Sequence, residues 1–218
     1  MKKDYVPEDL KINKDLDGMT LKMLTEHFKL YQGYVKKANE IQEKISAADK
    51  SEANAVYSYI GELKRQETFS VNGMKLHEVY FGHLGPSINS PRPELGTKAW
   101  QAAVEVGVPH GELVKMIEKD FGSLETWQED MIATGLSARG WAVLAYDFKD
   151  NRLHNYGADA HNVGAVWGAI PLIALDVYEH AYFMDYGVAR KDYINSFFKN
   201  LNWDYANGIV TKYRLAEI

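Results

Sequence analysis

The pattern of apolar and polar positions predicts a long amphipathic helix near the start of the chain. Residues up to about Asp17 carry mixed charge without periodicity, and we expect them to form an extended arm. Beyond them, apolar residues recur at helical spacing, and the polar residues between them are good helix formers. The apolar positions are Leu21, Leu24, Phe28, Tyr31, Val35, Ala38 and Ile41.

A second helical region is predicted to follow a loop at residues 49–53. Residues 56–64 are compatible with a short helix, and a major helix is expected to begin near Gly73. Its apolar side carries Leu76, His77, Tyr80, Phe81 and Leu84, and it is expected to end at Gly85-Pro86.

The prolines and glycines that continue to Gly96 mark a linker between two parts of the chain. We therefore predict an N-terminal helical hairpin domain over residues 1–90 and a C-terminal domain over residues 91–218. The second domain is expected to open with helices over residues 98–106, 111–120 and 124–137.

Partial alternation of apolar and polar residues then predicts a small antiparallel sheet. Residues 140–148 and 153–156 form the expected hairpin, and the apolar run 170–175 supplies a third strand. A C-terminal helix is expected from about residue 191 toward residue 201. The predicted fold class is therefore α+β, in which a helical hairpin domain precedes a mixed domain whose three-stranded antiparallel sheet is flanked by helices.

The third predicted strand ends in a carboxylate and an imidazole four residues apart, Asp176 and His180. A buried strand that delivers a charge must satisfy it, because an unpaired carboxylate in apolar surroundings is costly. A bound cation would do so, and so would a structural ion pair or a group of backbone donors. The D-x-x-x-H spacing is common, so these two residues alone leave the choice open.

Composition narrows the chemistry. With 46% hydrophobic and 25% charged residues among 218, the chain has an ordinary soluble globular composition. A net charge of -5 argues against a nucleic-acid partner, and an anionic substrate would require local positive potential. There is no cysteine, so metal ligands must be histidine or carboxylate. The sequence contains no run of 18 apolar residues, so no membrane span is predicted, and we expect a cytoplasmic, unanchored protein.

The second half of the chain carries a series of short motifs. They are D-F-G-S at 120–123, G-W-A-V-L at 140–144, D-V-Y-E-H-A-Y at 176–182, D-Y at 192–193 and N-W-D at 202–204. With the N-terminal helices, their order and spacing resemble the iron/manganese superoxide dismutase family over roughly residues 21–204. The family's two-domain architecture matches the one predicted from periodicity.

The resemblance implies disproportionation of superoxide to dioxygen and hydrogen peroxide at one iron or manganese ion per chain. It makes Asp176 and His180 two of four protein ligands to that ion. It also implies a homodimer or homotetramer, in which Glu179 reaches the partner's metal-ligating histidine across the interface.

The family takes one further histidine ligand from each helix of the hairpin. On the second helix, His77 in N-G-M-K-L-H matches the family position. His83 is a rival, but it lies six residues further on, on a different face just before the helix ends. We therefore expect His77 to be the ligand and His83 to be a surface or cap residue, while a satisfied core histidine remains the structural alternative for His77.

The first helix departs from the family pattern, and two residues compete for the remaining ligand position. Counting back from Tyr34 without a gap gives Glu26, whereas one deleted residue gives His27. On a helix, His27 lies within roughly 20° of Tyr34, and Glu26 lies roughly 80° away. We predict His27, with Glu26 as the alternative.

Further residues match positions around the family's metal. Tyr34 corresponds to the gateway tyrosine that relays a proton, and His161 to the residue that hydrogen-bonds the metal-bound solvent. Leu30 and Tyr31 replace the family's paired histidines, and Tyr178 replaces a tryptophan beside the site. Phe81, Trp141 and Tyr182 are expected to line the pocket, or simply to pack in the core, and Lys29 and Arg190 are candidates for attracting the anion.

Two other functions remain compatible with the sequence. A ligand set of three histidines and one aspartate also suits a non-redox metalloenzyme or an oxygenase. The altered first helix is compatible with a homologue that has lost the metal and serves as a binding or structural protein. Metal content and superoxide turnover separate these possibilities.

Overall fold

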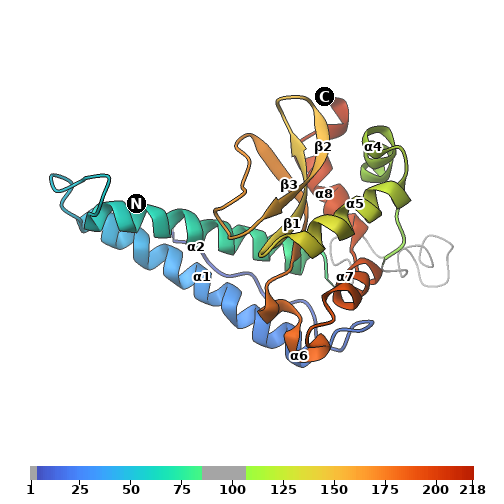
Figure 1. Cartoon of the computed structure of the whole chain (residues 1–218), viewed down its shortest axis with the longest axis horizontal. Helices are drawn as coiled ribbons and strands as arrows, with labels where there is room; N and C mark the ends of the chain where they lie inside the picture. Colours follow the sequence, from blue (N-terminus) through green and yellow to red (C-terminus); the bar gives the residue numbers. More distant parts are fainter. Residues whose placement is uncertain (1–3, 85–106) are drawn as a thin grey trace.

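The computed structural model describes residues 4–84 and 107–218, and its N-terminal part is a pair of long helices (Figure 1). Helix α1 spans Leu21–Ala47, and α2 spans Tyr59–Gly82 and packs against it. The N-terminal arm is tied to α1, because Asn39 exchanges two hydrogen bonds with the backbone of Tyr5.

The prediction of a short helix over 56–64 and a separate one from Gly73 was wrong, because α2 is continuous. Ser58 caps this helix by accepting a hydrogen bond from the Gly61 backbone. The connecting segment 64–68 is polar and lacks an apolar stripe, but Lys, Arg, Gln and Glu favour helix strongly enough to carry it through.

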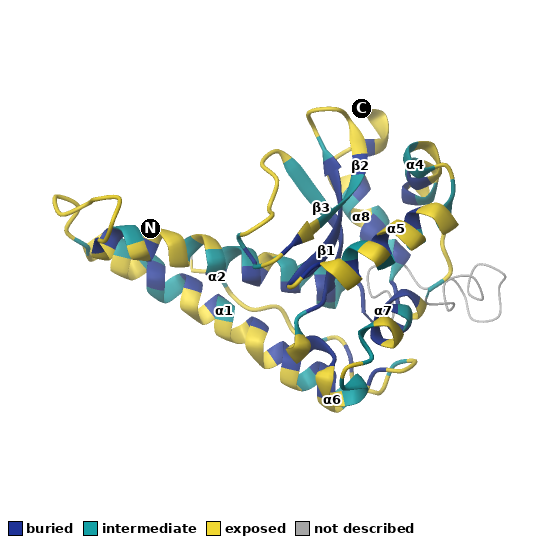
Figure 2. Ribbon diagram, viewed as in Figure 1, coloured by how far each residue is buried: buried dark blue, intermediate teal, exposed yellow. Residues whose placement is uncertain are grey.

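The second part contains the predicted three-stranded antiparallel sheet, in the order β2-β1-β3. Its strands are β1 at Trp141–Asp147, β2 at Arg152–Ala158 and β3 at Ala169–Asp176. The register of β1 against β3 shifts between Leu144 and Ala145, so that Leu172 of β3 is skipped in the pairing. Strand β1 and the second half of β3 are almost fully buried, as Figure 2 shows.

Helices surround the sheet and complete the α+β fold. They are α4 at Glu112–Phe121, α5 at Leu124–Ser137, α6 at Phe183–Tyr186, α7 at Arg190–Lys199 and α8 at Trp203–Lys212, with short 3-10 turns η1 at Glu179–Ala181 and η2 at Leu215–Glu217. Helix α8 was not predicted; Asn202 caps it and interrupts the helical pattern after α7.

Two predicted features fall on residues 85–106, outside the described residues. These are the helix over 98–106 and the domain boundary at residue 90. The helical pair and the sheet region contact each other directly. Helix α2 packs against β3, and α1 packs against η1. Thus the helices of the hairpin and the end of β3 meet, which is where the predicted ligands lie.

Candidate metal centre

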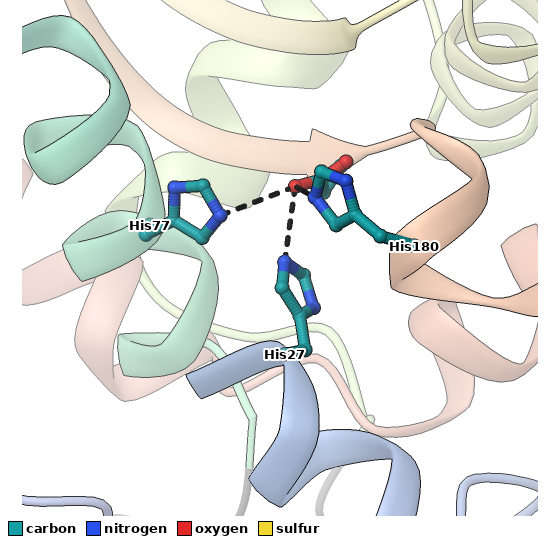
Figure 3. A group of neighbouring side chains, drawn as sticks. His27, His77 and His180 are labelled. Atoms are coloured by element: carbon teal, nitrogen blue, oxygen red, sulfur yellow. Dashed lines mark hydrogen bonds and ion pairs between the residues drawn. The ribbon is translucent and has the colours of Figure 1, made fainter. Parts of the chain in front are cut away.

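Four separate elements bring the predicted ligand residues together (Figure 3). His27 lies on α1, His77 on α2, Asp176 at the end of β3 and His180 in η1. The start of α1 is held near η1 because Asp185 of α6 accepts hydrogen bonds from the backbone and hydroxyl of Thr20.

One oxygen of Asp176 lies at the centre of this group. The Nε2 atoms of the three histidines are 3.1 Å (His27), 3.5 Å (His77) and 3.3 Å (His180) from Asp176 Oδ2. The potential ligand atoms all lie within 4.8 Å of one another. The side chains of His27, His77 and Asp176 are fully buried, whereas that of His180 is 29% exposed.

The hydrogen bonding of His77 leaves its other ring nitrogen available as a ligand atom. Its Nδ1 lies 2.6 Å from the Gly73 carbonyl oxygen, which can only accept, so Nδ1 carries the proton. Nε2 therefore presents a lone pair toward the ionised Asp176, and this buried atom has no hydrogen-bond partner. Two electron-rich atoms facing each other in an apolar pocket are unfavourable unless a cation lies between them. Hence these residues fit a transition-metal ion.

The protonation states also suit metal binding. Burial lowers the pKa of His77 to about 3, and burial likewise lowers the pKa of His27 despite its hydrogen bond to Asp176. Burial alone would raise the pKa of Asp176, but hydrogen bonds with His180 and His27 outweigh it and hold that pKa well below its ordinary value. Near pH 7 these three buried residues thus offer a carboxylate and two neutral imidazoles, the forms that bind metals.

On the first helix, the structure places His27 in the group and Glu26 outside it. Glu26 is exposed and pairs with Lys29 at 2.6 Å. Helix α1 is regular through this region, so His27 and Tyr34, seven residues apart, share a face.

His83 is not part of the donor group, and the expectation that it lies at the surface was wrong. It is the C-cap residue of α2, as the cap alternative predicted, but it is completely buried. Its Nε2 lies 2.7 Å from the Leu172 carbonyl oxygen. The helix ends under the sheet, so a cap residue there is enclosed.

Tyr34 and His161 lie beside the donor group and contact each other. Their ring centroids are 4.7 Å apart, and the ring of His77 is 5.3 Å from Tyr34 and 5.8 Å from His161. Trp141 Nε1 donates to His161 Nδ1 at 2.9 Å, so the proton of the neutral His161 ring is on Nε2. Burial lowers the pKa of His161 to about 4 and, with the Asp176 charge, raises the pKa of Tyr34 to about 12.

Comparison with known proteins shows similarity to iron/manganese superoxide dismutases over most of the chain. The family model described as iron/manganese superoxide dismutases, C-terminal domain, matches residues 109–208. The superoxide dismutase [Fe] of Aquifex aeolicus is 43% identical over 205 residues, which is 92% of this chain and 88% of the relative. The chain belongs to the iron/manganese superoxide dismutase family.

Other members of the superoxide dismutase family carry either metal in their names. The superoxide dismutase [Mn] 2 of Haloferax volcanii is 37% identical, covering 80% of this chain and 77% of the relative. The superoxide dismutase [Fe] of Cupriavidus metallidurans is 36% identical, covering 88% of each chain. The predicted family is therefore confirmed, while the choice of metal is not decided by the comparison.

Aromatic rings surround the donor group of this family member, and they include two of the three predicted wall residues, Phe81 and Trp141. Phe81 lies 5.1 Å from the His27 ring, Trp141 lies 5.1 Å from the His77 ring, and Tyr178 stacks on His180 at 5.2 Å. By contrast, the ring contacts of Tyr182 are with Tyr193 and Arg190.

Three aromatic residues near the dismutase-type centre were missed. Tyr80 contacts His27 at 4.9 Å, Phe69 contacts His161 at 4.5 Å, and the Tyr193 hydroxyl donates to the Asp176 carbonyl at 2.7 Å. Tyr193 belongs to the D-Y motif and was open to prediction from it. Phe69 lies in the part of α2 for which no helix was predicted.

The two residues that replace the family's paired histidines, Leu30 and Tyr31, lie outside the donor group. Leu30 is 41% exposed, whereas Tyr31 is buried. The Tyr31 hydroxyl accepts a hydrogen bond from the Glu8 backbone and donates to Glu78 at 3.2 Å, so it ties the N-terminal arm to α2.

The centre is the one group of metal-ligating residues found in the described part of the chain. In residues 4–84 and 107–218, none of the helices combines the length and the apolar character required to cross a membrane.

Proposed function

We propose that this chain is a superoxide dismutase whose metal ion is held by His27, His77, Asp176 and His180. The observation that carries the proposal is the convergence of three imidazole nitrogens, one of them a buried lone pair without a partner, on one ionised carboxylate oxygen. Membership of the iron/manganese superoxide dismutase family supports it independently.

When bound, the ion supplies alternate one-electron reduction and oxidation, by which superoxide becomes dioxygen in one half-reaction and, with two protons, hydrogen peroxide in the other. Four protein ligands leave room for solvent or the substrate anion. The surrounding aromatic rings exclude bulk water and so strengthen electrostatic interactions inside the pocket.

Tyr34 and His161 are proposed to handle protons. With its pKa raised to about 12, the Tyr34 phenol keeps its proton near pH 7 and is able to donate it. His161, fixed by Trp141, offers an Nε2 proton beside Tyr34. We infer that this N–H orients the solvent or substrate oxygen, as expected from the family.

Positive charge at the pocket entrance is proposed to come from Arg190 more than from Lys29. Lys29 is exposed and its charge is offset by Glu26. The guanidinium of Arg190 donates to the Tyr182 hydroxyl and the Ala138 carbonyl, which are neutral acceptors and leave its charge to act on an approaching anion.

We propose that the protein assembles as a homodimer or homotetramer through the region around His180. His180 is the exposed ligand, and Glu179 beside it is exposed as well. The neighbouring Phe183, Met184 and Val188 are 53%, 51% and 92% exposed, which a partner subunit would cover. The cytoplasmic location stays a prediction.

Iron and manganese share this ligand set, so we propose either ion, one per chain, and a direct experiment to distinguish them. Purified protein is reconstituted separately with each metal, and metal per chain and superoxide dismutation are measured. We expect about one ion per chain and activity with at least one metal. A parent protein that takes up neither metal and shows no activity would contradict the proposal.

The same experiment on two neighbouring variants tests the first-helix ligand. His27→Ala is expected to lose metal and activity, because it removes a buried ligand atom. Glu26→Ala is the matched control and is expected to keep both, since Glu26 faces solvent. Loss of metal in Glu26→Ala alone would show that the first-helix ligand is a carboxylate.

A further inference from the structure

His83 joins three elements of the fold, although it is not a metal ligand. Its backbone N–H caps α2 through the Val79 and Tyr80 carbonyls, and its backbone carbonyl accepts from the N–H of Asn202 at the start of α8. Its ring is completely buried and bonds β3 through the Leu172 carbonyl at 2.7 Å.

The acceptor of this bond lies at the irregularity in the sheet. In the pairing of β1 with β3, Leu144 is opposite Ile173 and Ala145 is opposite Pro171, so Leu172 is the skipped residue. A bulge bends its strand and re-aims the residues beyond it, and bulges recur beside active sites. Here the residue four positions further along β3 is Asp176.

The hydrogen bond to Leu172 shows which ring nitrogen of His83 carries a proton. A carbonyl oxygen only accepts, so Nε2 carries the proton of this bond, and burial lowers the pKa of His83 to about 4, which leaves the ring neutral near pH 7. A polar ring buried in the core costs stability compared with an apolar residue unless it is hydrogen-bonded. The bond to the bulge is the compensation that the structure offers.

We propose that His83 is a positioning residue for the metal centre, fixing the bulge of β3 against the end of α2 and thereby the placement of Asp176 relative to His77. His77 lies six residues before His83 on α2, and Asp176 lies four residues after Leu172 on β3. The bond thus closes a short structural loop that contains two of the four ligands. The inference rests on the proposed metal site and names a residue outside it.

The test compares His83→Gln, whose terminal amide places an N–H donor where the histidine Nε2 was, with His83→Leu, which has none. Protein is loaded with the metal that the parent takes up. The readouts are the ligand-field spectrum of the ion, by EPR for iron or visible absorption for manganese, and the rate of metal release to a chelator. His110→Leu is the control, because His110 also bonds a backbone carbonyl, that of Val108, but lies far from the donor group in sequence and is exposed.

We expect His83→Leu to change the spectrum and to release metal about tenfold faster, because mutation of residues that support metal ligands typically weakens metal binding by this factor or more. His83→Gln and His110→Leu should match the parent within about twofold on the same scale. If His83→Leu does not fold, His83→Asn replaces it: its amide is too short to reach Leu172, and it should behave as Leu was expected to.

An unchanged spectrum and release rate in His83→Leu or His83→Asn would overturn the inference. Equal perturbation in His83→Leu and His83→Gln would also overturn it, because packing rather than the hydrogen bond would then matter. A parent that binds no metal would instead refute the proposed function, so the two failures are distinguishable.

Discussion

At the scale of single residues, Asp176 determines the charge of the centre. It is ionised beside the neutral imidazoles of His27 and His77, so the buried part of the donor group carries a single negative charge. A divalent or trivalent ion bound there leaves a net positive site inside a protein whose overall charge is -5. The local charge, rather than the global one, is what an approaching superoxide anion meets after entering the pocket.

The hydrogen bond from Trp141 to His161 gives a prediction at this scale. Trp141→Phe keeps an aromatic ring against His77 but removes the N–H that fixes His161. A hydrogen bond is worth about 1 kcal/mol, which corresponds to roughly fivefold in rate. We expect dismutation to fall by about this factor while metal per chain stays unchanged. Loss of metal in Trp141→Phe would show that the ring, not the N–H, is what the centre requires.

The residues of the site differ in how far the sequence could predict them. The family resemblance and helical phase together favoured His27 over Glu26, because seven residues return a helix to nearly the same face. Tyr80 could not be assigned to the site in this way. Its contact with His27 depends on how α1 and α2 pack, which no local pattern encodes.

At the scale of elements, Gly73 is where α2 meets both Tyr34 and His161. A Cβ at Gly73 would lie 3.0 Å from the Tyr34 ring and 3.1 Å from the His161 ring. Both rings are held by other contacts, so Gly73→Ala is expected to displace the two residues that are proposed to handle protons. Overpacking of this kind costs about 1–3 kcal/mol.

We therefore expect Gly73→Ala to retain metal but to lose activity and some stability. Gly33→Ala, also in the middle of a helix, is the control, because an added Cβ there meets nothing within 4 Å. It should stabilise the protein by about 0.5–1 kcal/mol and leave activity unchanged. Activity assays and urea unfolding of both variants test this; equal activity in the two would contradict the expected crowding.

Elements with a strong periodic signal were predicted closely, and the misses have physical causes. The predicted helix over 124–137 matches α5, and the strands predicted at 140–148, 153–156 and 170–175 correspond to β1, β2 and β3. The middle of α2, between residues 64 and 73, was not predicted as helix because its residues stabilise helix by propensity without an apolar stripe. The fold class followed from element order, whereas the packing of α2 on β3 did not.

At the scale of the whole molecule, the proposed ligands connect both parts of the chain. Two come from the helical hairpin and two from the region at the end of β3. An ion that binds this folded arrangement and not the unfolded chain raises the free energy of unfolding, by about 4 kcal/mol at a thousand times its dissociation constant.

Metal removal is therefore expected to lower the melting temperature by roughly 8–16 °C, given about 2–4 °C per kcal/mol for a chain of this size. Calorimetry of metal-loaded and metal-free protein measures the difference. Glu26→Ala should show the same difference as the parent, and His27→Ala should show little, because it no longer holds the ion. Identical melting of the loaded and metal-free parent would contradict a structural contribution from the ion.

The contact between His27 and Asp176 spans 149 positions of the chain. At about 5–20 residues per second, the ribosome completes Asp176 roughly 7–30 s after His27. The hairpin helices are therefore made well before the strand that completes the donor set. The complete donor set exists only after the chain has been made through His180, so no ion is held by all four side chains before that point.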